Sequence, residues 1–233
     1  MKVVIAGGTS GIGLATAALL AKEGAAVTIT GRNPQKLEQA LATLPDTAQG
    51  ACVDAADVNQ LKTFMAATGP IDHLVLALSG AKGAGLFKDL DLTQLREGFA
   101  EKFFPQLQTL QSALPYLTAG GSVTFITAVS AQANMPGTAG LGAINGGLEI
   151  MVPILAKELQ PLRVNAVSPG VVDTPWWSFM PEDTRKAAFA QFAQTTPVGR
   201  IGAPEDIAKA IGMLIANTFV SGQVITVDGG AGI

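Results

Sequence analysis

The 233-residue sequence contains very few of the side chains on which extracellular and metal-binding proteins depend. Its single cysteine, Cys52, cannot form an internal disulfide, and its single histidine, His73, leaves no plausible zinc cluster, so no metal site is expected. Charged residues make up only 14%, against a usual share of about 25%, and the formal net charge is -3. This balance offers no basic surface for nucleic acid or an anionic membrane. We therefore expect a cytoplasmic protein without nucleic-acid partners.

Long apolar runs are also scarce. Residues 103–148 carry no charge, but Gln, Thr, Ser, Asn, Pro and Gly interrupt them so often that no run approaches the ~18 apolar residues of a spanning helix. The apolar N-terminal stretch leads into a patterned glycine loop rather than a cleavage site. The sequence therefore predicts no membrane segment.

Apolar residues nevertheless reach 48%, together with 27 glycines, and strand-like and helix-like stretches alternate along the whole chain. The expected strands are 2–6, 26–30, 50–53, 72–78, 122–127, 162–167 and 224–227. The expected helices are one that ends near Gly24, one from Pro34 through Leu44, and 57–67, 93–114, 141–159, 182–195 and 204–216. Apolar strands separated by helices predict a parallel sheet covered on both faces. We expect one Rossmann-type, doubly wound α/β domain over residues 1–233, with about seven strands.

Three glycines mark the first junction between strand and helix. Gly7, Gly11 and Gly13 lie where glycine permits a tight turn and close backbone approach to a pyrophosphate, which rests on the helix N-terminus. The position of this loop in an alternating chain makes a dinucleotide site the favoured interpretation.

The end of the second strand indicates which dinucleotide binds. Many NAD proteins carry an acidic residue there, whereas this chain reads Thr30-Gly31-Arg32-Asn33. Arg32 can pair with a 2′-phosphate that a carboxylate would repel, so NADP(H) is favoured over NAD(H). The alternative is that Arg32 is an exposed residue that merely caps the turn.

Five segments, in order, resemble motifs of the short-chain dehydrogenase/reductase family: AGGTSGIG (6–13), VDAAD (53–57), NAVSPGVVDT (165–174), PVGRIGAPEDIA (197–208) and SGQVITVDGG (221–230). The resemblance covers essentially the whole chain. It implies that Asp54 lies beside the adenine and that the segment after the sixth strand contacts the nicotinamide end. The full set of cofactor contacts that it implies is Gly7, Thr9, Ser10, Gly11, Ile12, Gly13, Arg32, Asn33, Asp54, Ala55, Ser79, Gly80, Lys102, Thr127, Pro169, Gly170, Val172 and Thr174.

The family's catalytic tetrad of serine, tyrosine, lysine and asparagine is absent. Alignment without gaps puts Ala128, Leu141, Asn145 and Lys102 at these four positions. Ordinary ketone and alcohol substrates of the family are therefore expected to turn over very slowly. The only tyrosine, Tyr116, precedes the fifth strand at the wrong end of the sheet, where a structural role is expected.

The asparagine and lysine of the family have exchanged places in this chain. In the family both positions face the nicotinamide ribose, so Lys102 is a candidate to hold the ribose or meet a developing oxyanion. Alternatively, Lys102 is a solvated helix residue and Asn145 a filler. The catalytic group stays unassigned, with Lys102, Thr127 and Asn145 as candidates.

The segment after Thr174 is rich in aromatic residues, beginning with Trp176 and Trp177. In the family this segment is a mobile lid, which indicates a small apolar substrate; alternatively, these rings pack the lid onto the body or onto another subunit. Pro153 is expected to kink the helix on which the family associates, and the resemblance implies a homodimer or homotetramer. Cys52 is expected in the core, and His73 at a surface turn where the fourth strand begins.

Two function classes follow. The first is an NADP(H)-dependent oxidoreductase with a remodelled active site, which transfers hydride to or from a small apolar carbonyl or alcohol compound. The second is a catalytically inactive NADPH-binding sensor or partner subunit. A scaffold without cofactor is disfavoured by the glycine loop and Arg32.

Overall fold

The computed structural model describes residues 1–232, and a single parallel sheet of seven strands lies at its centre. The strands are β1 (Lys2–Ala6), β2 (Ala26–Gly31), β3 (Gln49–Cys52), β4 (Ile71–Leu76), β5 (Leu117–Ile126), β6 (Arg163–Pro169) and β7 (Val224–Val227). They lie in the order β3-β2-β1-β4-β5-β6-β7, and every neighbouring pair is parallel. The predicted α/β fold class is confirmed.

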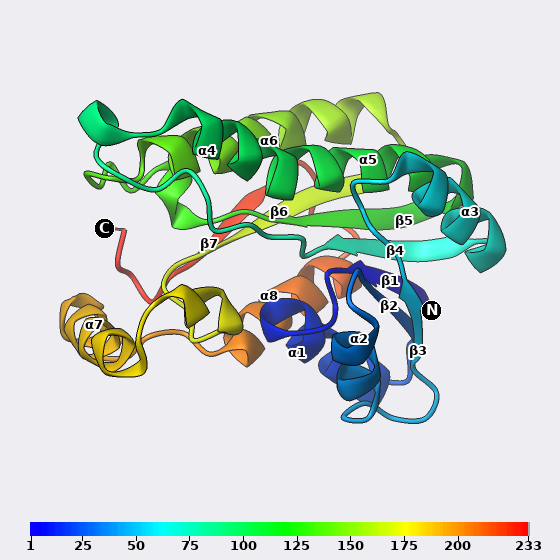
Figure 1. The fold of residues 1–233 in the computed structure, drawn as a ribbon. Helices are drawn as coiled ribbons and strands as arrows, with labels where there is room; N and C mark the ends of the chain where they lie inside the picture. The colour runs from blue at the N-terminus through cyan, green and yellow to red at the C-terminus, as the bar shows by residue number, and fades with distance from the viewer. Residues whose placement is uncertain (233) are drawn as a thin grey trace.

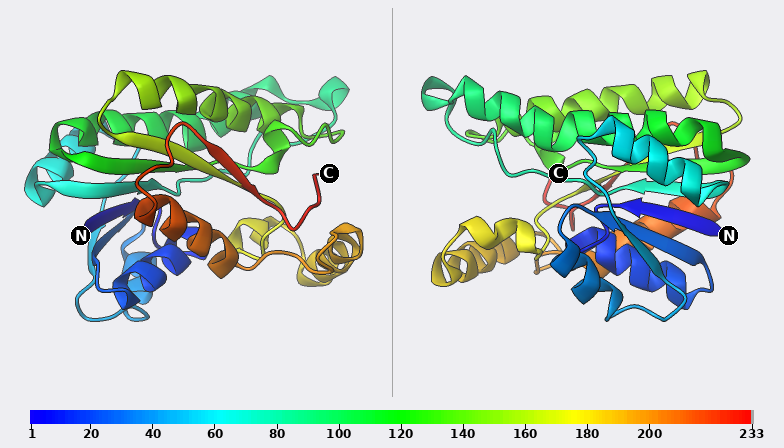
Figure 2. Two further views of the ribbon diagram at one scale, coloured as in Figure 1. Left: turned by 180° about the vertical axis from the view of Figure 1, so that it is seen from behind. Right: turned by 45° about the vertical axis from the view of Figure 1, so that its right-hand side comes forward.

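Helices cover both faces of this sheet (Figure 1). One face carries α1 (Gly11–Lys22), α2 (Pro34–Leu41) and α8 (Pro204–Ala216), and the other carries α3 (Val58–Thr68), α4 (Leu92–Gly98), α5 (Phe104–Ala113) and α6 (Ala139–Glu158). The views in Figure 2 show the same layers, with α7 (Glu182–Thr195) standing apart beside the edge where the strands end.

Alternation along the strands builds two separate apolar cores. Val3 and Ile5 of β1 lie in the core with Leu20 of α1, whereas Val4 lies in the core with Leu148 of α6. Successive side chains of a strand point to opposite faces, so a strand covered on both sides is apolar at every position. This explains why short uninterrupted apolar runs located the strands correctly.

The helix expected at 93–114 is divided into three parts. A π-helical segment, η2 (Phe99–Phe103), joins α4 to α5 and contains Lys102. Pro105 has no N–H to donate to the Glu101 carbonyl, so the regular α-helical ladder is interrupted at this junction. Single π-helical turns occur frequently at functional sites.

Two single-residue expectations are wrong. Cys52 is exposed rather than in the core, because it ends β3, the edge strand of the sheet. His73 lies inside β4 rather than at a surface turn, since the strand already begins at Ile71. Its half-buried ring places Nδ1 2.8 Å from the Ser122 Oγ on the neighbouring strand, and burial lowers the pKa of the ring.

Helix α6 matches the helix expected at 141–159. Its 20 residues have a mean hydropathy of 1.5 over an 18-residue window, which meets the length and composition of a spanning helix. In the fold it lies along the sheet, with Leu148 and Val152 buried in the second core. Pro153 stands inside the helix without ending it.

One buried cation joins the sheet to α8. Arg163, at the start of β6, is only 7% exposed and donates to three backbone carbonyls. Nη1 donates to Leu214 O at 2.7 Å and Val220 O at 3.0 Å, while Nη2 donates to Ile215 O at 3.0 Å. The Leu214 and Ile215 carbonyls lie in the last turn of α8, where helical partners run out, and Val220 lies in the loop that follows.

Replacing this cation is expected to destabilise the fold. The Arg163→Met substitution keeps the apolar stem but leaves the three carbonyls without their donor, which should cost roughly 1–3 kcal/mol of unfolding free energy. Urea denaturation followed by circular dichroism measures the change. The exposed Arg96→Met variant serves as the control and should stay within about 0.5 kcal/mol of the parent. Equal midpoints for both variants would contradict the assigned role of Arg163.

Candidate active site

A cleft of about 870 Å³ opens where the parallel strands end. Its walls are the loops after strands β1 to β6, together with the π-helical segment and part of α6. Every residue expected to contact the cofactor lines this cleft, as do Asn145 and the tetrad positions Ala128 and Leu141. The structure thus brings together residues that are up to 167 positions apart, from Gly7 to Thr174.

The glycine loop has the geometry of a phosphate cradle. Gly7 has φ +83°, and a Cβ there would stand 2.7 Å from the Ala77 carbonyl oxygen; a Cβ on Gly13 would collide with the Gly7 carbonyl. No side chain caps the first turn of α1 at Ser10, so backbone N–H groups at this helix start remain available to an anion. These features fit a dinucleotide pyrophosphate.

The far end of the cleft is positively charged. Arg32 is exposed, and its guanidinium forms no ion pair within residues 1–232. Lys36, on the first turn of α2, lines the same wall and was missed from the sequence. Asn33 caps that helix by accepting from Lys36 N at 2.9 Å, while the Asp54 carboxylate accepts from Ala56 N at 3.0 Å.

At the inner end, Lys102 is buried rather than solvated. It is 7% exposed, and Nζ donates to the Thr127 carbonyl at 3.1 Å. Burial lowers the pKa of its ammonium group to about 8, while the Glu149 carboxylate opposes this shift. The alternative of a solvated helix residue is therefore wrong.

Glu149 is the functional candidate that sequence reasoning missed. This α6 carboxylate is 8% exposed, and its Oε1 accepts from Thr127 Oγ1 at 2.8 Å and Ser168 Oγ at 2.9 Å. Its Oε2 accepts from Gln132 Nε2 at 3.0 Å. A signal was present, because Glu149 is the first charged residue after the uncharged stretch 103–148. Lys102 and Glu149 thus hold Thr127 from opposite sides, one at its carbonyl and the other at its hydroxyl.

Asn145 presents an acceptor without a partner. Its Nδ2 donates to Ser130 Oγ and to Leu141 O, both at 3.0 Å, whereas the buried Oδ1 has no partner among the described residues. A buried acceptor without a donor is costly, so this oxygen suits a ligand hydroxyl in the cleft. The observation fits a nicotinamide ribose.

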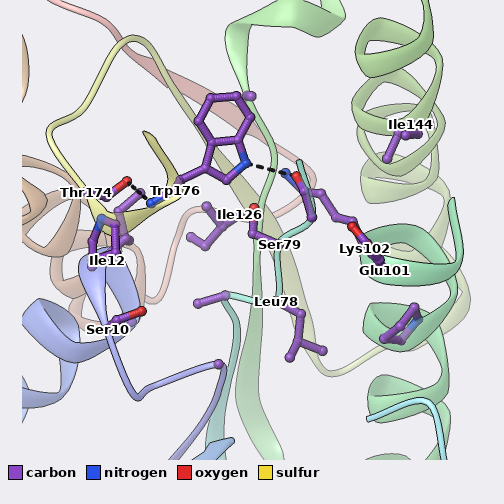
Figure 3. Close-up of a pocket in the computed structure, with 18 of the residues that line it drawn as sticks. Ser10, Ile12, Leu78, Ser79, Glu101, Lys102, Ile126, Ile144, Thr174 and Trp176 are labelled. Atoms are coloured by element: carbon purple, nitrogen blue, oxygen red, sulfur yellow. Dashed lines mark hydrogen bonds between the residues drawn. The ribbon is translucent and has the colours of Figure 1, made fainter. Parts of the chain in front are cut away.

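The aromatic segment after β6 has two distinct parts. The Trp176 indole Nε1 donates to the Gly80 carbonyl at 2.9 Å, so this ring reaches across to the loop after β4, where Figure 3 labels Ser79. Trp177 instead donates to Val172 O and packs against Phe179, Phe189 and Phe192. One tryptophan therefore bridges the cleft, and the other holds the lid together.

Tyr116 lies in the turn before β5, at the end of the sheet where the strands begin, and packs against the second core. The cleft lies at the other end of the strands. The expected structural role is consistent with this placement.

Comparisons with known proteins agree with the geometry. A family model described as enoyl-(acyl carrier protein) reductase matches residues 6–232. The chain belongs to the short-chain dehydrogenase/reductase family. It is therefore a member of an oxidoreductase family that binds a nicotinamide cofactor.

Three similar proteins cover almost all of this dehydrogenase/reductase chain. 3-Oxoacyl-(acyl-carrier-protein) reductase FabG from Thermotoga maritima is 31% identical, with 97% of this chain and 96% of the relative covered. A solved small-chain dehydrogenase in complex with NADPH is 34% identical, with a TM-score of 0.88 over 99% of this chain and 98% of that one. A short chain oxidoreductase from Pseudomonas aeruginosa PAO1, described as containing an atypical catalytic center, is 28% identical, with a TM-score of 0.89 over 98% and 96%.

The buried ammonium predicts a specific pH dependence of stability. The pKa of Lys102 is about 8 in the folded protein and 10.5 ordinarily, so the unfolded chain binds the proton more tightly between these values. Stability contributed by this group is present above pH 10.5 and lost as the pH falls through 8. The unfolding free energy of the parent minus that of Lys102→Met should therefore rise by at most about 3 kcal/mol from pH 7.5 to 10.5. Urea denaturation at several pH values tests this, and parallel curves would contradict a buried ammonium.

The indole bridge predicts local rather than global weakening. Trp176→Phe keeps an aromatic ring but removes the N–H that binds Gly80, at a cost of about 0.5–1.5 kcal/mol. Amide hydrogen exchange in residues 174–195 should accelerate about 2- to 10-fold, with the sheet unaffected. Unchanged exchange in this segment would show that the bridge does not hold the lid.

Proposed function

We propose that this protein is an NADP(H)-dependent oxidoreductase with a remodelled active site, which transfers hydride to or from a small apolar carbonyl or alcohol compound. The observation that carries the proposal is one continuous cleft. It has a phosphate cradle and an Arg32 without an ion pair among the described residues toward one end, and Lys102 and Thr127, backed by Glu149, toward the other. When bound, the nicotinamide supplies the hydride, so the protein's task is to orient two reactants and manage one proton.

Three features support NADP(H) over NAD(H). β2 ends without an acidic residue, and two cations, Arg32 and Lys36, line the wall where a 2′-phosphate would lie. The NADPH complex of the small-chain dehydrogenase adds support from a similar protein. Arg32 offers two parallel hydrogen bonds to a phosphate, and Lys36 offers a second positive charge.

The inner end would position the nicotinamide side of the cofactor. The unpartnered Asn145 Oδ1 would accept a hydrogen bond from a ribose hydroxyl, and the Lys102 ammonium would supply a positive charge at the same end of the cleft. Trp176 closes the cleft from the opposite side by binding Gly80, which limits the access of water to the reacting atoms.

A second candidate function is a catalytically inactive NADPH-binding sensor or partner subunit. It is favoured by Ala128 and Leu141, which cannot replace the family's serine and tyrosine as hydrogen-bonding groups. The two functions differ in one measurement, namely hydride transfer by cofactor-loaded protein.

We further propose a cytoplasmic homodimer or homotetramer. Phe104 of α5 and Ile150 and Ile154 of α6 expose apolar side chains on one helical layer, by 53%, 66% and 49%, which supports association through this layer.

The cofactor assignment predicts a clear preference. Calorimetric titration should show tight binding of NADPH and much weaker binding of NADH. Arg32→Asp should weaken NADPH binding by roughly 10- to 100-fold, because a charge-assisted hydrogen bond contributes about 1.5–3 kcal/mol. NADH binding should change little.

Lys62→Asp makes a similar change in charge on α3, outside the cleft, and should leave both affinities unaltered. Equal affinity of the parent for the two nucleotides would overturn the assignment. Transfer of deuterium from NADPH labelled at C4 to a small ketone or aldehyde separates the enzyme from the inactive binding protein.

A further inference from the structure

Carbonyl reduction at this site lacks an obvious proton source. The family's tyrosine position holds Leu141, and its serine position holds Ala128. Thr127 already donates its hydroxyl proton to Glu149, at 2.8 Å. Ser130 accepts from Asn145 at 3.0 Å, and an alkyl hydroxyl is a poor acid. A reduced carbonyl oxygen would therefore need a different acid.

Lys102 has the placement that such an acid requires. Its Nζ carries three N–H groups, and only the Thr127 carbonyl accepts from it within residues 1–232. The side chain is buried, yet it lines the cleft at the junction of the π-helical segment and the end of β5. Its remaining donors can be satisfied by a ligand, because Lys102 belongs to the wall of the cleft.

We propose that Lys102 is the proton donor and acceptor of this oxidoreductase, in place of its family's tyrosine, and that Glu149 sets the charge state of Lys102 from behind Thr127. The inference rests on the proposed function and deepens it by naming the catalytic acid. The two groups do not form a direct ion pair, since Thr127 lies between them and binds both.

Carbonyl reduction by this route transfers one hydride to carbon and one proton to oxygen. The carbonyl carbon accepts hydride from the reduced nicotinamide, which is oxidised, while the electron pair of the carbonyl π bond moves to oxygen. That oxygen takes a proton from the Lys102 ammonium, which becomes a neutral amine and regains a proton from water. The reverse reaction uses the amine as a base for the alcohol proton. A pKa of about 8 suits both directions near neutral pH.

The surrounding charges determine when Lys102 is protonated. Glu149 faces it from α6 and favours the ammonium form. Glu97 and Glu101, on the helical segment that carries Lys102, share the cleft but pair with Lys82 at 2.6 and 3.4 Å. Glu149 is therefore the one carboxylate, among the described residues near Lys102, that no cation already pairs directly.

The first test needs no turnover. The free protein is exposed to traces of acetic anhydride from pH 6 to 11, and mass spectrometry measures the acetylation of each lysine. Lys102 should label with a midpoint near pH 8, whereas exposed Lys62 should follow an ordinary lysine. NADPH should protect Lys102, and Glu149→Gln should move its midpoint to lower pH. An ordinary midpoint, or no labelling of Lys102 in the open cleft, would overturn the proposal.

The second test follows hydride transfer from C4-deuterated NADPH to a panel of small apolar ketones and aldehydes. Lys102→Met should reduce the rate about 10²- to 10⁴-fold, the usual contribution of a general acid. Lys102→Arg should be equally slow, because arginine keeps the positive charge but does not release a proton. Lys62→Met should match the parent. Carbonyl reduction by the parent should slow as the pH rises through the labelling midpoint.

The outcomes separate the two proposals. Full activity of Lys102→Arg or Lys102→Met would contradict Lys102 as the acid while leaving the oxidoreductase function intact. Failure of the parent to transfer deuterium, although it binds NADPH, would contradict the oxidoreductase function itself. Glu149→Gln should shift the pH profile of hydride transfer to lower pH, in the same direction as the labelling midpoint, a readout that a purely structural carboxylate would not move.

Discussion

Parallel pairing of all seven strands is the constraint on which this structure depends. Each strand must be followed by a crossover before the next parallel strand begins, so the chain alternates between strand and helix and covers both faces of the sheet. The same rule places every carboxyl end at one edge. Loops that are distant in the sequence therefore form one cleft, and the chemistry of the protein is decided by the residues that follow each strand.

Within that cleft, Thr127 is the residue that is hydrogen-bonded to both Lys102 and Glu149. Its position at the end of β5 fixes a carbonyl and a hydroxyl in space, and these two groups bind a cation from the π-helical segment and an anion from α6. Both charged side chains are almost fully buried, so the electrostatic attraction between them offsets part of the free energy that is needed to bury each charge. The inner end of the cleft is thus not purely apolar, because a buried cation and a buried anion lie beside Thr127.

Most of the fold could be predicted from the sequence because its signals are local. Runs such as residues 2–6 and 224–227 are apolar at nearly every position, and glycine or proline marks several of the junctions. The residues expected to contact the cofactor could be predicted from motifs at these junctions. The features that could not be predicted depend on which residues become neighbours in the folded chain. Lys102 is buried because the segment that carries it packs against the end of β5. Glu149 contacts Thr127 and Ser168 only when α6 packs over β5 and β6. Cys52 was misplaced because the position of β3 at the sheet edge is a property of strand order.

The lid described above has an optical consequence. The chain contains only two tryptophans, and both lie in the short segment that follows β6. Trp176 spans the mouth of the cleft, whereas Trp177 is enclosed by the aromatic rings of the lid itself. The indole emission of the whole protein therefore originates in its lid, with no contribution from the sheet or the helical layers. A change in that emission reports on the environment of this segment, so the sequence already carries a spectroscopic probe at one wall of the cleft.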